Sequence, residues 1–569
     1  MASIGIDLGT TNSLIAYITE DGPKIIPNSF GENLTPSVVS IDEEGQILTG
    51  KIAQELMVTN PQNTVSVFKR SMGTKREYPL GGRKFLPEEL SAFIIKKLKE
   101  DAEVYLGELV EEAVISTPAY FNDAQRRATK TAGELAGLRV ERIVSEPTSA
   151  AIAYGLHTKP EATQFLVFDL GGGTFDVSIL EFTGNIMEVH AVAGDNFLGG
   201  EDFTEILMRL FLEKHGIPFA SLCLQELSAL HKSAETAKRQ FASESMVTMT
   251  YKRNEELLTL DISRSLYEDA CAPLLARLKA PIVRALSDAS IKQSEIDTVV
   301  LVGGATKLPI VRTFVSKLFG RFPAIDVNPD EAVALGAAIQ AGMKDRMDAI
   351  KELILTDVCP YTLGIETVIE MPGGVFQEGN FTPILERNTV IPASRIRRLY
   401  TAFDNQSAIE VCILQGESRK VEDNIFLGEL IVPVTPAKSG EVSIDVRYTY
   451  DINGILEVEV TVVNTGEKLR TVIEKNPGLL TAEEIQERLE ALSEIKIHPR
   501  EQDRNKFLLE KGARLYQESL GRVRDEIGRA LSVFDAVLEY QDPDEINRIA
   551  AQLEEFLRAF ERNPFGFEE

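Results

Sequence analysis

The chain has 569 residues, too many for a single hydrophobic core, so several domains are expected. Hydrophobic residues (44%) and charged residues (26%) occur at the levels of an ordinary globular protein. The net charge of −27 would repel a phosphate backbone, so no nucleic-acid partner is expected, and we interpret this charge as a source of solubility.

The first part of the chain, residues 1–345, alternates strand and helix patterns. It enters a predicted strand at Ile4, which leaves no room for a signal peptide. Apolar runs at 113–115, 165–168 and 299–302 predict buried strands, and residues 123–136 predict a helix between two of them. This alternation is typical of an α/β domain.

One motif in this domain occurs twice, at residues 4–12 and 167–176. Each copy has a short apolar strand, then Asp-Leu-Gly, then a turn rich in glycine and hydroxyl groups, then another apolar strand. A single Asp-Leu-Gly is weak evidence for a phosphate site, because glycine turns commonly follow strands. Two matching copies predict two related lobes that hold the same phosphate chain, since such turns let backbone amides approach phosphate oxygens.

The carboxylates of the two copies, Asp7 and Asp169, end their strands and predict a site for a hydrated Mg²⁺. A third glycine motif, Gly303-Gly304, follows a buried strand and leads into a predicted helix. By itself it reads as a tight strand–helix turn; its glycines would also permit close approach by an adenine or a ribose.

Residues 346–357 form a predicted interdomain linker. Its end, residues 352–357, is apolar where a solvated linker would be polar. Two interpretations stay open: an edge strand of either neighbouring domain, or a linker that docks in one state and is released in another.

Residues 358–480 are rich in β-branched residues and turns. Apolar and polar residues alternate over 444–450 and again over 456–462, on either side of Asn453-Gly454. Asn-Gly suits the positive φ angles of a tight hairpin turn, so this region predicts a small antiparallel β-sandwich.

Residues 481–569 have a helical pattern. A capping box begins at Thr481, and apolar residues then recur at spacings of three and four. They are Leu520, Val523, Ile527, Leu531, Phe534 and Leu538, and, after a break at Asp542-Pro543, Ile546, Ile549, Leu553, Phe556 and Phe560. We expect a compact helical bundle that ends the chain.

The positions of the cysteines and histidines indicate the redox compartment and bear on metal binding. Cys223, Cys271, Cys359 and Cys412 form no Cys-x-x-Cys pair, which favours reduced thiols in the cytoplasm. The five histidines are also far apart, so no zinc site is expected. No run approaches the ~18 apolar residues of a membrane span, so no membrane partner is expected.

The three glycine motifs, in this order, resemble those of the actin-like ATPase superfold. Five segments then resemble the DnaK-type heat-shock chaperones (heat shock protein 70 family): residues 114–121, 146–151, 198–203, 357–364 and 404–407. The resemblance covers roughly residues 3–490. The short helical region, the absence of an acidic tail and Cys359-Pro360-Tyr361 resemble the HscC subfamily most.

This resemblance implies a multidomain fold: an α/β actin-like two-lobed ATPase domain, an antiparallel β-sandwich peptide-binding domain and a short α-helical lid. It implies an ATP-dependent chaperone that binds and releases extended apolar segments of unfolded client proteins, with affinity switched by hydrolysis of ATP to ADP and phosphate. The implied cofactors are ATP/ADP and Mg²⁺, with K⁺ as a further candidate. A J-domain co-chaperone is implied; a nucleotide-exchange factor stays open, because residues 211–275 are fewer than in typical members.

The catalytic residues come from the same resemblance. Lys69 matches a lysine that assists attack on the γ-phosphate, although a lysine alone is usually a solvated surface residue. Glu146, Asp169, Thr174 and Asp176 match residues that position Mg²⁺ and water. No covalent nucleophile is needed, because phosphoryl transfer to water depends on positioning and charge stabilisation.

The implied nucleotide-binding residues lie in the glycine motifs and on one helix face. They are Asp7, Gly9, Thr10, Thr11, Asn12, Gly171, Gly172, Gly173, Thr174, Gly199, Gly200, Glu201, Glu235, Lys238, Arg239, Gly303, Gly304, Lys307 and Asp330. Without the resemblance, Glu235, Lys238 and Arg239 would read as solvated charges with i,i+4 partners. Ala242 and Lys307 replace the family's usual Ser and Arg, and a lysine cannot stack flat over adenine. Two alternatives follow: a weaker nucleotide affinity, or rearranged adenine contacts.

The resemblance also implies a peptide groove and an interdomain relay. The groove would be lined by Ile365, Thr367, Val368, Leu399, Tyr400, Ala402, Ile409 and Val411, with Val368 and Ala402 as an arch over the peptide. In a β-sandwich such apolar residues are ordinarily core. The relay comprises Pro118, Arg126 and Asp357, and Thr356 replaces the leucine expected in the linker.

Two other functions share parts of this pattern. An actin-like small-molecule kinase would have the phosphate motifs, but residues 357–563 have no evident role in it. An exchange-factor-like relative that does not hydrolyse ATP would not need Lys69, Glu146 and Asp169.

Overall fold

The computed structural model describes residues 3–42, 44–155, 163–183, 186–253, 256–324, 327–344, 354–371, 375–451, 456–473, 499–501, 503–519 and 521–562. The chain divides into two compact units. The first unit comprises residues 1–361 and 387–391, and the second unit comprises residues 362–386 and 392–569. The expected domain limits at 345 and 480–481 lie outside the described residues.

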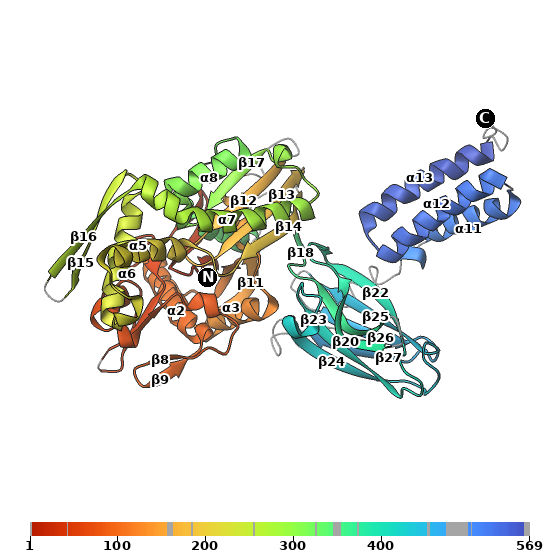
Figure 1. The fold of residues 1–569 in the computed structure, drawn as a ribbon, viewed down its shortest axis with the longest axis horizontal. Coiled ribbons are helices and arrows are strands. Elements are labelled where there is room, and N and C mark those ends of the chain that lie inside the picture. Colours follow the sequence, from red (N-terminus) through yellow and green to blue (C-terminus); the bar gives the residue numbers. More distant parts are fainter. Residues whose placement is uncertain are drawn as a thin grey trace. The chain divides into compact units, whose positions relative to one another are not determined.

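Two mixed sheets of matching design form the centre of the first unit (Figure 1). In one sheet, β1 (Ser3–Asp7) is parallel to β10 (Glu112–Thr117) and antiparallel to β2 (Asn12–Thr19). In the other, β12 (Thr163–Leu170) is parallel to β17 (Thr298–Val302) and antiparallel to β13 (Phe175–Thr183). The repeated motif therefore has the same strand environment in both copies.

The strand orders are β11-β10-β1-β2-β3, with β4 on β2, and β17-β12-β13-β14-β18-β21. The other strands of the first unit are β3 (Gly22–Ile25), β4 (Thr35–Pro36), β5 (Val38–Ile41), β6 (Ile47–Thr49), β7 (Thr64–Ser66), β8 (Tyr78–Leu80), β9 (Arg83–Phe85), β11 (Arg139–Ser145), β14 (Ile186–Asp195), β15 (Met246–Arg253), β16 (Glu256–Ser263), β18 (Ile354–Val358) and β21 (Val390–Ile391).

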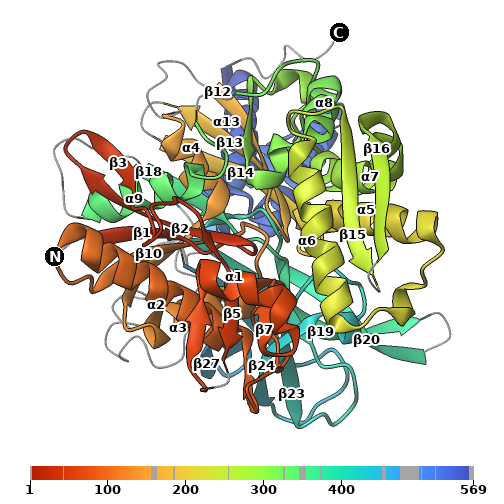
Figure 2. The same ribbon diagram turned by 90° about the vertical axis from the view of Figure 1, so that its left-hand side faces the viewer.

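Its helices are α1 (Gly50–Thr59), α2 (Pro87–Leu106), α3 (Asp123–Leu135), α4 (Glu146–Ala153), α5 (Gly200–His215), α6 (Leu224–Gln240), α7 (Arg264–Asp288), α8 (Pro309–Phe319) and α9 (Ala332–Lys344). Figure 2 shows the resulting lobes, one containing α1 and α2 in red and orange and the other α5 and α6 in yellow-green.

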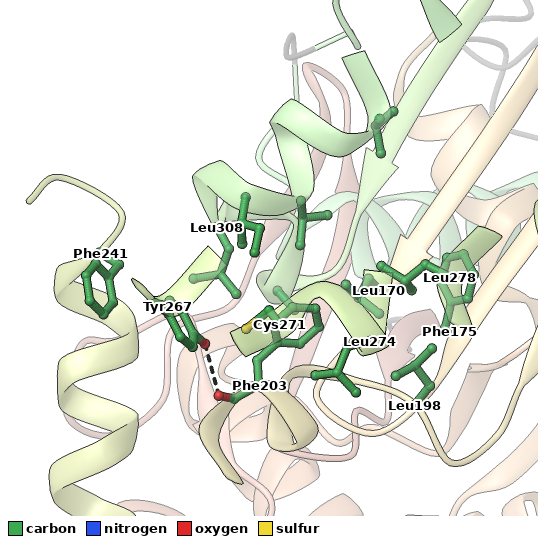
Figure 3. Packing of buried hydrophobic residues seen from close by; sticks show 14 of the residues in the cluster. Leu170, Phe175, Leu198, Phe203, Phe241, Tyr267, Cys271, Leu274, Leu278 and Leu308 are labelled. Carbon is green, nitrogen blue, oxygen red and sulfur yellow. Dashed lines mark hydrogen bonds between the residues drawn. The ribbon is translucent and has the colours of Figure 1, made fainter. Parts of the chain in front are cut away.

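Aromatic side chains fix α5 and α7 against the second sheet (Figure 3). Phe175 of β13, Phe203 of α5 and Tyr267 of α7 are fully buried in one apolar cluster. The Tyr267 hydroxyl donates to the Phe203 carbonyl oxygen at 2.9 Å, so the one polar group of this ring is satisfied inside the core. This packing fixes the N-terminus of α5 beside the loop between β12 and β13.

The end of the predicted linker forms β18, a strand of the first unit. It lies parallel to β14, with Thr356 opposite Glu188, and antiparallel to β21, with Asp357 opposite Ile391. The end of the linker is therefore a strand of the first unit, as one interpretation expected, but it lies between β14 and β21 rather than at the edge of the sheet. Linker residues before 354 lie outside the described part of the chain.

The second unit begins with two four-stranded antiparallel sheets, ordered β20-β19-β23-β24 and β22-β25-β26-β27. Their bounds are β19 (Leu363–Met371), β20 (Val375–Leu385), β22 (Ala393–Tyr400), β23 (Ala408–Gln415), β24 (Ile425–Pro433), β25 (Ser443–Tyr450), β26 (Leu456–Val462) and β27 (Lys468–Ile473). The Tyr448 hydroxyl of one sheet donates to the Gly364 carbonyl oxygen of the other at 2.9 Å. β25 and β26 pair as the predicted hairpin requires, whereas Asn453-Gly454 lies outside the described residues.

The described residues after β27 contain three α-helices, α11 (Asp503–Glu518), α12 (Gly521–Tyr540) and α13 (Pro543–Arg562). Ile527, Phe534 and Leu538 of α12 are buried with Leu553 of α13, as the predicted spacing requires. The Thr481 capping box and Leu520 lie outside the described residues. Every helix in the described ranges is too short or too polar to cross a membrane.

Candidate functional site

The two repeated loops face one cavity of about 420 Å³ in the first unit. Most of the residues predicted to bind nucleotide or to act in catalysis line it. They are Asp7, Gly9, Thr10, Thr11, Asn12, Lys69, Glu146, Asp169, Gly171, Gly172, Thr174, Gly200, Glu201, Glu235, Lys238, Arg239, Gly303, Gly304, Lys307 and Asp330. Gly173, Gly199 and Asp176 were predicted with them but do not line the cavity.

Backbone hydrogen bonds hold each loop in shape. In the first loop, the Gly9 N–H donates to the Ser13 hydroxyl at 3.2 Å, and the Ser37 hydroxyl donates to the Gly9 carbonyl at 2.8 Å. In the second, the N–H groups of Gly200 and Glu201, at the start of α5, donate to the carbonyls of Gly171 and Gly172 at 2.9 Å each. Contacts within the first unit therefore hold both loops in these conformations.

Lys69 lines the cavity from a short 3₁₀ turn (Phe68–Ser71). The preceding Val67 has a φ of 59°, a strained left-handed conformation for a β-branched residue. The Lys69 Nζ is 3.0 Å from Glu146 Oε1 at the start of α4, and both side chains are buried. Glu146 thereby fixes the direction of the lysine ammonium.

Three further carboxylates, Asp7, Asp169 and Asp176, interact electrostatically with this pair. Burial raises the pKa of Asp7 from 3.8 to about 7, with repulsion from Glu146 as the next cause. The pKa of Asp169 is also raised well above its usual value, by burial and then by Glu146. The cluster therefore holds more negative charge than one lysine can neutralise, and a bound cation would relieve it.

Asp176, predicted as catalytic, lies behind the cavity rather than in its wall. Its Oδ1 accepts a hydrogen bond from the Tyr120 N–H at 3.0 Å, and its side chain is buried. Burial raises the pKa of Asp176 to about 7, although the Tyr120 N–H acts in the opposite direction. Its action on a ligand would therefore be through neighbouring groups.

Two buried polar atoms in the cavity wall have no hydrogen-bond partner: the Thr11 hydroxyl and Asp169 Oδ2. Such atoms are rarely left unsatisfied in a native protein, so they indicate a polar ligand. A hydroxyl donor and a carboxylate acceptor fit a phosphate chain with a hydrated cation. Within the described ranges, no three His, Cys, Asp or Glu side chains are arranged to hold a metal directly.

Other parts of the cavity wall combine ion pairs with apolar side chains. Lys238 is 2.5 Å from Glu235 and donates to the Thr204 hydroxyl at 2.8 Å, and Lys307 is paired with Asp330. Gly303 has a φ of 83°, and a Cβ there would collide with the Leu170 backbone. Apolar wall residues that sequence reasoning missed are Leu14, Leu34, Val302, Ala305, Leu308, Pro329 and Val333.

Arg70 is a further residue that sequence reasoning missed. Its Nε donates to the Gly173 carbonyl at 2.9 Å, and its Nη2 lies 2.7 Å from Asp202 Oδ2. Asp202 in turn accepts from the Gly199 N–H at 2.8 Å. Gly173 and Gly199, absent from the cavity wall, are thus held by this clamp, which joins the Lys69 turn to the second loop.

The predicted relay residues lie in two places within the first unit. Arg126 is buried and donates to the carbonyls of Ala119 and Phe121 at 3.0 and 3.2 Å, which fixes the turn after Pro118. Asp357 lies on β18, and its charge acts on Arg142, whose pKa is lowered by desolvation and raised in part by Asp357.

The predicted groove residues divide by exposure. Ile365, Ile409 and Val411 are buried in the β-sandwich, whereas the Tyr400 side chain is 60% exposed. The remaining four, Thr367, Val368, Leu399 and Ala402, are partly exposed. The set therefore spans the interior and the surface of the sandwich.

Comparison with known proteins agrees with this geometry. A family model described as Hsp70 protein matches residues 3–80 and 76–561. The chain is similar to chaperone protein DnaK of Thermotoga neapolitana, with 43% identity over 485 residues, which is 83% of this chain and 80% of that relative. Proteins of the same name from Thermotoga petrophila and Thermotoga maritima match with the same identity and coverage.

Proposed function

The chain belongs to the Hsp70 protein family, and from this membership we propose that it is an ATP-dependent molecular chaperone. The family expected from the sequence is thereby confirmed, whereas the HscC subfamily stays a prediction. The observation that carries the proposal is the cavity where both repeated loops, Lys69 and Glu146 meet beside two unsatisfied polar atoms.

We propose that the two matching lobes form an actin-like ATPase. Bound MgATP would supply a γ-phosphoryl group that water can attack. The loop amides and the Thr11 hydroxyl would bind phosphate oxygens, and Asp7 and Asp169 would accept hydrogen bonds from the waters of the cation. Lys69, held by Glu146, would stabilise the charge that develops in the transition state. Thr174, which also lines the cavity, would help to position the attacking water.

The second unit would bind the client. An antiparallel sandwich with partly exposed apolar residues supports binding of an extended apolar peptide by backbone hydrogen bonds and a side-chain pocket. The helices α11–α13 would form the lid, and β18 would carry the nucleotide state between the units. We further propose a cytoplasmic setting, consistent with four free thiols, and a J-domain co-chaperone.

The kinase alternative gains no specific support, because it gives the second unit no role. A relative that does not hydrolyse ATP would not need the buried Lys69–Glu146 pair, so that alternative is also disfavoured.

Single-turnover hydrolysis tests the proposal. Lys69→Ala should reduce the hydrolysis rate at least about a hundredfold while ATP affinity stays within about tenfold, because it removes charge stabilisation from the transition state. Lys84→Ala, which removes a lysine side chain that is 69% exposed, is the matched control. Short apolar peptides should raise the wild-type rate. Wild-type rates in Lys69→Ala, or a peptide panel that neither binds nor stimulates, would contradict the proposal.

A further inference from the structure

Tyr361, where the chain first leaves the first unit, contacts the turn that holds Asp176. The Tyr361 hydroxyl donates to the Tyr120 carbonyl oxygen at 3.0 Å, and the centroids of the two rings are 4.7 Å apart. The Tyr120 N–H donates to Asp176 Oδ1 at 3.0 Å. Tyr120 therefore connects Tyr361 to the buried carboxylate of Asp176.

There is little free space around this connection. A Cβ added at Gly194 would lie 2.9 Å from Tyr120 Cβ and 3.0 Å from Asp176 Oδ1, so the backbone of β14 packs closely against both. Asp176 Oδ1 is held, whereas its Oδ2 is buried without a hydrogen-bond partner. Because packed groups rearrange rather than deform, a displaced Tyr120 would change how Asp176 is oriented.

Tyr361 lies between two anchored residues. On one side, the Cys359 thiol donates to the Tyr361 carbonyl at 3.0 Å, and the Cys359 N–H donates to the Thr389 carbonyl at 2.9 Å, within the first unit. On the other side, Thr362 opens the second unit, where its N–H and hydroxyl donate to Glu417 at 2.8 and 3.1 Å. Any force that the second unit exerts along the chain at this crossing therefore reaches Tyr361 first.

We propose that Tyr361 is a positioning residue for ATP hydrolysis, acting through Tyr120 to hold Asp176 with one oxygen fixed and the other free. The inference rests on the proposed ATPase function. It adds to Pro118, Arg126 and Asp357 a contact made by the residue at the boundary of the two units. When the contact is formed, Asp176 has the orientation that supports hydrolysis; when Tyr361 is pulled away, that orientation is lost.

Two substitutions separate the ring from the hydroxyl. Tyr361→Leu removes the ring contact and should lower the single-turnover rate about tenfold while leaving the ATP dissociation constant within about twofold. Tyr361→Phe keeps the ring and should recover most of the rate. Tyr105→Leu is the matched control, because Tyr105 also pairs with a tyrosine, Tyr17, at 6.0 Å, but is half exposed and remote from the cavity wall.

Thermal unfolding and peptide binding without nucleotide, measured on the same full-length variants, establish that each is folded. The inference is overturned if Tyr361→Leu hydrolyses ATP at the rate of Tyr105→Leu, or if its ATP affinity falls by the same factor as its rate. It is also overturned if Tyr361→Phe is as slow as Tyr361→Leu. A wild-type protein that does not hydrolyse ATP would instead contradict the proposed function itself.

Discussion

Removing either member of the Lys69–Glu146 pair should destabilise the first unit, and by unequal amounts. The two charged atoms are 3.0 Å apart, and the side chains are only 4% and 9% exposed. Breaking such a buried pair by removing one partner typically costs about 3–5 kcal/mol, because the other charge is left buried. Lys69→Met and Glu146→Gln make this comparison with little change in volume.

The surrounding carboxylates make the two costs differ. The charge of Glu146 raises the pKa of Asp7, Asp169 and Asp176, and the charge of Lys69 lowers it. In Glu146→Gln a neighbouring carboxyl can ionise more easily and pair with Lys69, so we expect a loss of only about 1–2 kcal/mol. In Lys69→Met no cation remains for the cluster, and we expect the full loss of about 3–5 kcal/mol.

Urea denaturation of the nucleotide-free, full-length chain measures both losses. The sequence has no tryptophan, so far-UV circular dichroism is the suitable signal, and the transition that shifts on addition of Mg·ADP belongs to the first unit. The variant that carries both Lys69→Met and Glu146→Gln should be more stable than Lys69→Met alone. Its free energy of unfolding completes the double-mutant cycle. A Glu146→Gln variant less stable than Lys69→Met, or two variants within about 0.5 kcal/mol of wild type, would refute this reasoning.

Two further predictions concern protonation and the sandwich surface. Because the pKa of Asp7 is about 7 in the folded state and 3.8 when unfolded, the folded state binds more protons between these values, and wild-type stability from this group falls as pH rises through that window. Asp7→Asn should therefore gain stability relative to wild type by up to about 1.4 kcal/mol per pH unit between pH 5 and 7, measured by urea midpoints; a constant difference would contradict this. Tyr400→Ala should weaken binding of a labelled apolar peptide about fivefold or more while unfolding changes by less than about 0.5 kcal/mol, unlike the control Phe322→Ala, which should change neither; unchanged anisotropy titrations would exclude Tyr400 from the groove.

The local parts of this structure were predictable because their signals are local. A strand, a glycine turn and a returning strand follow one another in the sequence, so both repeated loops and the β25–β26 hairpin could be predicted from short windows. The Arg70–Asp202 clamp could not, although Arg70 directly follows Lys69 and Asp202 lies in the segment 198–203. Nothing in the spacing of 132 positions indicates which charges meet.

The sequence also could not predict which apolar residues of the sandwich are buried and which are exposed. Alternating apolar residues identify the sandwich, but the pattern is the same for Val411, which is buried, as for a groove residue that contacts a ligand. Likewise, β18 lies parallel to β14 although about 170 positions separate them, and parallel pairing of this kind leaves no turn motif to read. Asp176 was recognised by its motif, whereas its position behind the cavity depends on the turn at Tyr120.

The short strand β21 has a consequence for how the first unit can be studied by itself. Its residues, and Arg387 and Asn388, which both bond Asp288, return to the first unit from between two strands of the sandwich. The first unit is thus discontinuous in sequence. A fragment that ends at Tyr361 would leave the backbone of β18 open to strand addition by a second molecule, so aggregation of such a fragment would reflect the cut rather than a property of the intact chain.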